Sequence, residues 1–540
     1  MRCPSGLSAA VLATVMLASS GCRGVDELAI TTPAEPSEVD TIIAGGMVFD
    51  GTGATGRSID IAILDDRIVY VGEDAAARFR ARNTIDAVGL VVAPGFIDPH
   101  THADADLVSS DADRRANKAY AFQGVTTVLV GNDGFGDYRI ADMASVAIES
   151  GIGTNVAWLV GFGAVREEVL GRVDREPDAA ELAQMGALTR QAMCEGAWGF
   201  STGLYYVPQN FAKTEEVVAL ARIAAEFGGY YDTHMRDEST YNVTVTGALA
   251  ETLKIGREAG LPVHIAHIKA LGPAVWGHSE RMIAMIEEAQ ASGQQVSADQ
   301  YPWEASGTRI SNALVPRWAL EGGLEALRER LAKPEQRLAI RAGIEEAIER
   351  RGGADRLLVT GALGEAEVET VKTLEQLARD QSTAPADAAI AVLRTGDARL
   401  ASFNMNPDDI AAFAARDWVV TGSDGSTGHP RKYASFPKAY RDLVADGGMM
   451  DMARFVRRSS GQTADIIGLQ GRGYLKPGYF ADVVVLDPER FAPRATYSAP
   501  EELSSGVVHL LVNGEVVIRG GAHTGQLPGR PLLKPASCAS

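Results

Sequence analysis

Four histidines stand where short apolar runs of the sequence end, and together they could bind metal ions. His100 and His102 follow the run "APGFID". In an extended segment residues i and i+2 point to the same side, so two imidazoles at this spacing can reach one ion. His234 and His267 end two later runs, and the chain has only 9 histidines in all. This pattern predicts a metal centre with histidine and carboxylate ligands.

Two aspartates stand at comparable points of the sequence. Asp133 follows the run "VTTVLVGN" and Asp424 follows "VVTGS". Either could simply belong to a turn, since Asn-Asp-Gly and Ser-Asp-Gly are typical turn sequences. The functional alternative for Asp424 is acid–base catalysis, because one carboxylate beside a metal can take a proton from bound water and give one to the leaving nitrogen of an amide. His264 stands three residues before His267, so strand alternation should turn it to the opposite side, and we interpret it as structural.

The elements that would bring these side chains together are short apolar runs that alternate with helical patterns. Eight such runs lie between residues 93 and 425, and stretches such as 214–228 and 278–293 have helical periodicity. The alternation predicts an α/β fold, a (β/α)8 TIM barrel over residues 97–469. In such a barrel the carboxyl ends of the strands line one face, where distant residues converge. The stretch 306–417 is too long for one crossover and is predicted to be a helix-rich insertion.

Both ends of the chain carry β-rich segments. Runs punctuated by Gly and Asp-Gly near the start, and an Asn-Gly hairpin signal near the end, predict one small β-sandwich domain built from residues 40–96 and 470–530.

The first residues predict export. Residues 1–22 hold a short apolar run that cannot span a bilayer as a permanent anchor, and we interpret them as a signal peptide. "SSGC" is similar to a bacterial lipoprotein signal, in which Cys22 would be lipidated and attach the protein to a membrane; ordinary cleavage after Ser20 is the alternative. Residues 23–39 have the composition of a flexible linker. We therefore expect a periplasmic protein or a membrane-anchored lipoprotein of a bacterial cell envelope.

Composition narrows the function classes. The 540 residues carry a formal charge of -19 without any Lys/Arg cluster, which argues against nucleic-acid binding. The cysteines are few, at positions 3, 22, 194 and 538, and do not indicate a disulfide framework. Because there is no Cys-x-x-Cys pair, any metal should be held by histidine and carboxylate. A small-molecule substrate is the expected partner.

Motifs along residues 40–530 resemble the amidohydrolase superfamily and, within it, the N-acyl-D-amino-acid deacylases, also called D-aminoacylases. They are, in chain order, "VVAPGFIDPHTHADAD", "GVTTVLVGNDG", "GFSTGLYYVP", "YYDTHMRDES", "HIAHIKALG", "ADQYPWEASGT", "TGSDGSTGHPRKYASFPK", "GRGYLKPGYFADVVVLDP" and "VVHLLVNGEVV". The resemblance implies the barrel, the small β-sandwich made from both ends, and an insertion that covers the site.

The resemblance also implies a role for each site residue. It implies that His234 and His267 bind a tightly held zinc, and that His100 and His102 bind a second metal more weakly. It implies that Asp424 is the general base and acid. The groups that hold the substrate's α-carboxylate would be Lys269, Tyr301, Ser306 and Arg431. The reaction implied is hydrolysis of an N-acyl-D-amino acid to a carboxylate and a free D-amino acid.

The sequence departs from the family pattern at two points. Asp133 stands where these deacylases usually carry a metal-bridging Cys. Oxygen is a harder ligand than thiolate and would shift preference from zinc, the first expectation, toward manganese or cobalt. Ser306 stands one place before the family's serine, whose position is taken by Gly307.

These departures leave two other functions open. One is a different envelope amidohydrolase, such as a cyclic amidase or a dipeptidase for D-residue or isopeptide substrates. The other is an exported binding protein that kept the barrel and lost catalysis.

Overall fold

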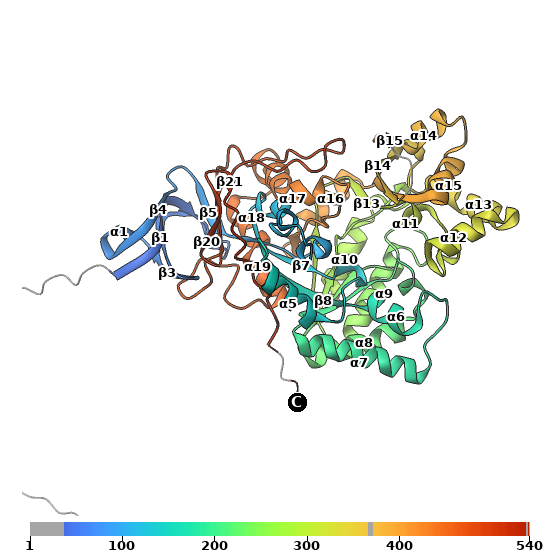
Figure 1. Ribbon diagram of the computed structural model, residues 1–540, viewed down its shortest axis with the longest axis horizontal. Coiled ribbons are helices and arrows are strands. Elements are labelled where there is room, and N and C mark those ends of the chain that lie inside the picture. The colour runs from blue at the N-terminus through green and yellow to red at the C-terminus, as the bar shows by residue number, and fades with distance from the viewer. Residues whose placement is uncertain (1–36, 365–370, 536–537, 539–540) are drawn as a thin grey trace, which may run out of the picture.

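The computed structural model describes residues 37–364, 371–535 and 538 of the chain (Figure 1). The predicted signal peptide, Cys22 and most of the predicted linker lie outside the described residues, so these predictions stay predictions. Among the residues described, no helix combines the length and the apolar character needed to cross a membrane.

A barrel of eight parallel strands forms the centre of the molecule. The strands are β6 (Phe96–Asp98), β7 (Val125–Val130), β8 (Asn155–Gly161), β9 (Gly199–Gly203), β10 (Tyr230–His234), β11 (Val263–Ile265), β12 (Val296–Gln300) and β17 (Val419–Thr421), hydrogen bonded to their neighbours in this order. Nearly every residue in them is buried, as expected for strands covered on both faces. The predicted (β/α)8 barrel is confirmed, and all eight apolar runs are its strands.

The seam between the first and last strands is closed by the segments that carry candidate site residues. The backbone N–H of Asp424 donates to the carbonyl of His100 at 3.0 Å, and the N–H of His102 donates to the carbonyl of Gly425 at 3.1 Å. A parallel bridge between Thr101 and Gly425 lies between these bonds. Closure of the barrel therefore fixes the residues after β6 and β17 relative to one another.

Helices cover the outside of the barrel (Figure 1). They are α2 (Asp104–Leu107), α3 (Ala112–Arg115), α4 (Lys118–Ala121), α5 (Ile140–Ser150), α6 (Phe162–Leu170), α7 (Ala179–Glu195), α8 (Thr214–Glu226), α9 (Val245–Ala259), α10 (Ser279–Ala291), α16 (Pro407–Ala414), α17 (Arg431–Tyr440), α18 (Met452–Ser459) and α19 (Gly461–Ile467). The sequence sets the ends of the long helix α7: Asp178 and Glu181 form a reciprocal capping box at its start, and Gly196, with φ 111°, ends it.

The two ends of the chain build one small domain, as predicted. Its strands are β1 (Ser37–Val48), β2 (Arg57–Leu64), β3 (Arg67–Gly72), β4 (Phe79–Asp86), β5 (Val91–Pro94), β18 (Val483–Leu486), β19 (Val507–Val512), β20 (Glu515–Arg519) and β21 (Ala522–His523), and one short helix, α1 (Ala75–Arg78), joins β3 to β4. They are linked into a single nine-stranded sheet in which β5 pairs with β18. Figure 1 shows the early strands β1, β3 and β5 beside the late strands β20 and β21.

The insertion has its own sheet and core, which the sequence did not predict. It contains β13 (Ala305–Arg309), α11 (Ile310–Leu314), α12 (Gly323–Ala332), α13 (Pro334–Arg350), β14 (Leu357–Gly364), β15 (Lys372–Thr373), α14 (Leu374–Asp380), α15 (Pro385–Thr395) and β16 (Gly396–Phe403). The strands pair in the order β13-β16-β14-β15. The insertion therefore ends near residue 403 rather than 417, because α16 packs against α10 of the barrel.

A disulfide joins Cys194, in α7, to Cys538 near the end of the chain. The few cysteines did not indicate a disulfide framework, and this single bond was not predicted. Its partners are 344 residues apart in sequence, so no local spacing reveals them. They meet because the last described residues run along the barrel, where the Lys534 N–H donates to the Gly196 carbonyl at 2.9 Å and the Trp198 indole donates to the Leu532 carbonyl at 2.6 Å.

We expect loss of this disulfide to lower stability but not hydrolysis, since neither cysteine approaches the barrel's carboxyl-end face. Cross-links closing long loops typically stabilise by about 2–4 kcal/mol. Thermal unfolding with and without reductant should show a lower midpoint in reductant, and Cys194→Ser should have the low midpoint in both conditions. Equal midpoints for the parent protein in both conditions would contradict this expectation.

Candidate metal centre and active site

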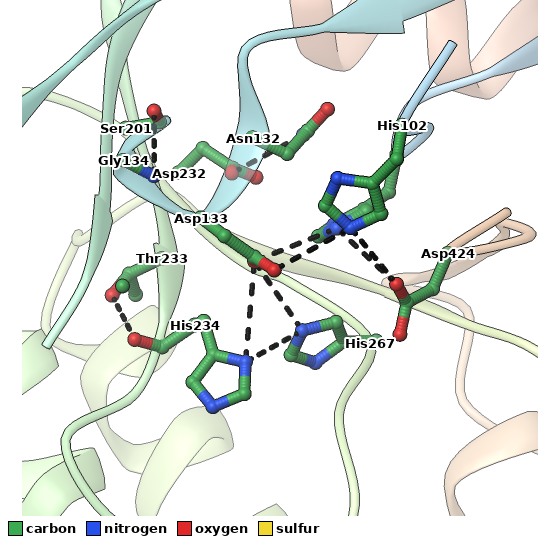
Figure 2. A network of polar contacts seen from close by, with 12 residues as sticks. His102, Asn132, Asp133, Gly134, Ser201, Asp232, Thr233, His234, His267 and Asp424 are labelled. Carbon is green, nitrogen blue, oxygen red and sulfur yellow. Dashed lines mark hydrogen bonds and ion pairs between the residues drawn. The ribbon is translucent and has the colours of Figure 1, made fainter. Parts of the chain in front are cut away.

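Five potential metal ligands meet at the carboxyl-end face of the barrel. Figure 2 labels four of them, His102, Asp133, His234 and His267. They come from four strand ends: His100 and His102 after β6, Asp133 after β7, His234 at the end of β10 and His267 after β11. Their ligand atoms form two groups, one of His100, His102 and Asp133 and one of Asp133, His234 and His267, each within 4.8 Å. The structure thus brings together all five predicted ligands, with Asp133 shared by both groups.

The Asp133 carboxylate lies between two pairs of imidazoles. Its Oδ1 is 3.5 Å from Nε2 of His100 and 3.5 Å from Nε2 of His267, and its Oδ2 is 3.5 Å from Nε2 of His102. Nδ1 of His234 lies 2.9 Å from Nε2 of His267. A carboxylate placed in this way can bridge two cations.

The donor atoms fit a metal ion. Nε2 of His100 and Oδ1 of Asp133 are buried and have no hydrogen-bond partner among the described residues, a costly state that a cation would relieve. Burial lowers the pKa of His100 to about 4 and that of His234 to about 4, so both rings stay neutral near pH 7. Neutral imidazole is the form that binds metal. His267 differs: burial and Lys269 lower its pKa, but Asp424, Glu238 and Asp133 raise it to about 10, so this ring would have to release a proton to bind a cation.

The predicted Asn-Asp-Gly turn follows β7 in the structure, and it also places the Asp133 side chain among the metal-binding histidines. Asp133 adopts the left-handed conformation with φ 57°, which Asp and Asn tolerate better than other side chains. Its carbonyl accepts a hydrogen bond of 2.8 Å from the Gln209 side chain, and the Gly134 N–H donates to Ser201 Oγ at 3.1 Å. A side chain at Gly134 would collide with Gln209. These contacts hold the Asp133 side chain toward the histidines.

Asp424 stands beside the metal-binding groups and pairs with an arginine. Its Oδ1 is 3.3 Å from Nε2 of His102, and its Oδ2 is 2.7 Å from Nη1 of Arg431. Burial alone would raise the pKa of Asp424, but the Arg431 guanidinium and the neighbouring histidines hold it well below its usual range. Asp424 is therefore ionised at neutral pH. By contrast, His264 turns away to Ser297 and Asp299, in agreement with a structural role.

Comparison with known proteins identifies the family. A model described as "Amidohydrolase family" matches residues 83–518, most of the chain. The chain belongs to the amidohydrolase family.

Several relatives of this amidohydrolase are deacylases by name. D-aminoacylase of Alcaligenes xylosoxydans xylosoxydans is 34% identical, covering 92% of this chain and 98% of the relative, and N-acyl-D-glutamate deacylase of the same organism is 32% identical, covering 93% and 98%. A solved D-aminoacylase described as having a binuclear metal centre matches with a TM-score of 0.78 and 33% identity over 92% of this chain and 100% of the other. N-acyl-D-glutamate deacylase from Bordetella bronchiseptica, solved with zinc and a phosphonate inhibitor, matches with a TM-score of 0.78 and 30% identity over the same shares.

The predicted carboxylate-binding groups of the amidohydrolase line a small cavity beside the metal-binding groups. Lys269, Tyr301, Ser306 and Arg431 all border it. Nζ of Lys269 lies 2.7 Å from Nδ1 of His267, whereas Ser306 Oγ lies 3.2 Å from the side-chain amide of Asn404. Arg431 keeps its Nε without a hydrogen-bond partner in the described structure. The cavity thus holds two cationic donors, Lys269 and Arg431, each paired with a carboxylate of the same lining, Glu238 and Asp424.

Gly307 explains the displaced serine. A Cβ at this position would lie 3.0 Å from His429 and 3.2 Å from the Arg431 guanidinium. The Gly307 carbonyl accepts a hydrogen bond of 3.1 Å from Nη2 of Arg431. The space of the missing side chain is occupied by the arginine that pairs with Asp424, so a serine here would require Arg431 to move.

Sequence reasoning missed Glu238, a buried carboxylate of the site. Its Oε1 accepts a hydrogen bond of 2.6 Å from Lys269 and lies 3.3 Å from Nδ1 of His267. Burial opposes its charge, but His234, Lys269 and His267 hold the pKa of Glu238 well below its usual range. A carboxylate behind a ligand histidine fixes the ring and strengthens it as a ligand. The only sequence signal was its place four residues after His234 in "HMRDE".

Proposed function

We propose that this amidohydrolase uses bound metal to hydrolyse N-acyl-D-amino acids to a carboxylate and a free D-amino acid. The observation that carries the proposal is the Asp424–Arg431 pair, which borders the small cavity lined by Lys269 and Tyr301, with Asp424 3.3 Å from His102 of the metal-binding groups. Relatives named D-aminoacylase, N-acyl-D-glutamate deacylase and N-acyl-D-aspartate deacylase, each at least 30% identical, support the same reaction.

The metal proposed first is zinc, held tightly by Asp133, His234 and His267, with a weaker second ion at His100 and His102. Nitrogen and oxygen donors suit zinc, and the oxygen of Asp133 also accepts manganese or cobalt. A divalent ion at this place supplies Lewis acidity that polarises the amide carbonyl and activates water.

The side chains of the protein supply the proton transfers and the orientation. Asp424 accepts a proton and later gives it to the departing nitrogen, and Arg431 keeps this carboxylate ionised between turnovers. Lys269, Tyr301 and Arg431 would bind the α-carboxylate in the small cavity of about 30 Å³, which leaves the rest of the substrate in the larger cavity of about 450 Å³. This arrangement would place the amide bond over the metal-binding groups.

The direct test is hydrolysis of N-acetyl-D- and N-acetyl-L-amino acids and of D-containing dipeptides by the purified protein with zinc, manganese and cobalt. Release of amino acid from the D-acyl series supports the proposal. Absence of turnover with stoichiometric bound metal would favour the binding-protein alternative.

Replacing Lys269 by Met should raise KM for N-acetyl-D-amino acids by about tenfold or more, the loss expected for a charged hydrogen bond. A neutral cyclic amide would not suffer this loss. Because Lys269 also contacts His267, bound metal should be measured on the same sample. An unchanged KM with full metal content would remove Lys269 from the carboxylate site.

We also propose export to the cell envelope, by the apolar run and Cys22 of the N-terminal segment. The Cys194–Cys538 disulfide supports this location, since disulfides persist in oxidising compartments. Mass spectrometry of the mature N-terminus from cell fractions tests it: a chain starting at Met1 in the cytoplasmic fraction would contradict export, and a diacylated Cys22 would identify a lipoprotein.

A further inference from the structure

Two arginines of the insertion face each other across paired strands. Arg309 of β13 and Arg399 of β16 are direct partners in the antiparallel register. Side chains of such partners lie on the same face of the sheet, and like charges at this spacing destabilise it. Within the described part of the chain, neither arginine forms an ion pair or a side-chain hydrogen bond. Arg309 is exposed and Arg399 is half-buried, so solvent screens part of this repulsion, and an anion bound between the two would relieve the rest.

Both arginines line the larger cavity, which also borders His102, Asp133 and Asp424 at the metal-binding groups. Other arginines of this cavity have carboxylate partners: Arg114 pairs with Asp106, Arg172 with Glu167 and Arg431 with Asp424. Asp397 is two residues before Arg399, but its carboxylate accepts hydrogen bonds from Ser311 instead. The positive charge of the pair is thus available to the cavity.

Arg399 is held in place by its surroundings. Gly428 lies in the loop between Asp424 and Arg431, and a Cβ there would be 3.0 Å from Cβ and Cγ of Arg399. Nε of Arg399 is buried and has no partner in the described structure. Burial and the neighbouring charges of Arg309 and Arg431 lower the pKa of Arg399 to about 10, so it stays charged at pH 7. A buried donor on a fixed cation is costly unless an anion binds it.

We propose that Arg399 and Arg309 bind a second carboxylate of the substrate, in addition to the α-carboxylate. The inference rests on the proposed deacylase function and narrows its substrate class. The second carboxylate could belong to an acidic amino-acid side chain or to the far end of a dicarboxylic acyl group, and the two sources share the chemistry that the arginines recognise.

The test compares matched acidic and neutral substrates. Comparing N-acetyl-D-glutamate with N-acetyl-D-glutamine tests a carboxylate on the amino-acid side chain. Comparing N-succinyl-D-alanine with the analogue whose far succinyl carboxylate is an amide tests a carboxylate on the acyl group. We expect kcat/KM to favour the acidic member by about tenfold or more in one of the two pairs, since a hydrogen bond between charged groups has this effect. Equal values within both pairs would overturn the inference.

Variants assign the preference to the arginines. In Arg399→Gln the preference should disappear, because kcat/KM falls for the acidic substrate and stays the same for the neutral one. Arg309→Gln should weaken the preference, and Arg399→Lys should keep part of it. Arg172→Gln, at the same cavity but paired with Glu167, is the control and should keep the preference. If Arg399→Gln slows both members equally, or leaves the preference intact, the inference is wrong.

Two further readouts separate this inference from its alternatives. The thermal midpoint of Arg399→Gln should equal or exceed that of the parent, because the substitution removes a like-charge contact, and a large fall would mean that Arg399 is structural. If the parent protein hydrolyses no N-acyl amino acid at all, the proposed function fails. If it hydrolyses neutral substrates as well as acidic ones, only the second-carboxylate site fails.

Discussion

Asp424→Asn should reduce kcat by about 10²–10⁴-fold, the usual contribution of general acid–base catalysis, while the metal stays bound. The amide has the shape of the carboxylate but cannot accept a proton at neutral pH. Asp424 belongs to neither group of metal-binding side chains, although it lies 3.3 Å from His102. The measurements are kcat, KM and metal content of the same preparation.

The control for this variant is Asp106→Asn. Asp106 lines the same cavity and pairs with Lys432 and Arg114. Its replacement by Asn therefore removes a paired carboxylate from the same cavity, but not one beside the metal-binding groups. It should keep kcat within about tenfold. Because Asp424→Asn leaves the buried Arg431 without its carboxylate partner, thermal unfolding must show that the Asp424→Asn protein is folded. A folded, metal-loaded Asp424→Asn protein with near-normal kcat would disprove the role of Asp424.

Asp133→Asn should weaken metal binding by more than the about 10–100-fold seen for residues that only support a ligand. Its carboxylate is the one side chain common to both metal-binding groups. Asn tolerates the left-handed backbone at φ 57°, so the variant removes charge without adding strain. Metal content after dialysis, with zinc, manganese and cobalt in turn, measures the loss. Asp133→Cys should retain zinc and bind manganese less well, because thiolate is the softer ligand.

Asp232→Asn is the matched control for the metal experiment. Asp232 is buried near the centre and accepts a hydrogen bond from Asn132, but it belongs to neither metal-binding group (Figure 2). Burial raises its pKa to about 7, so a neutral amide changes its charge only partly. This variant should keep its metal. Stoichiometric metal in Asp133→Asn would mean that Asp133 is not a ligand.

The barrel could be predicted because its strands are buried on both faces. Such strands appear in the sequence as apolar runs that end on a polar residue, and these endings predict that His100, Asp133 and His234 lie on one face of the barrel. The insertion sheet gives no such pattern. β13 reads "ASGTR" and pairs with β16, whose residues come about ninety positions later, so neither periodicity nor a hairpin turn marks it.

Glu238 shows the same limit within the site. It follows Asp237, and local sequence does not distinguish the two carboxylates. Asp237 accepts backbone N–H groups of Ser239 and Asn242 and organises a turn, whereas Glu238 reaches Lys269 and His267. Only the path of the chain after β10 decides which of the two faces the site.

The pairing of β5 with β18 in the small domain has a consequence for folding. Val91 and Leu486 are register partners, so the domain closes only after nearly the whole chain has been made. Contacts of such long sequence separation form late, because the entropy of closing the loop must be overcome first. Until then the apolar strand β5 has an unpaired edge, the kind of surface on which strands of other copies add. Only an intact chain can cover that edge, and cleavage between the two ends would leave an aggregation-prone strand rather than a separate domain.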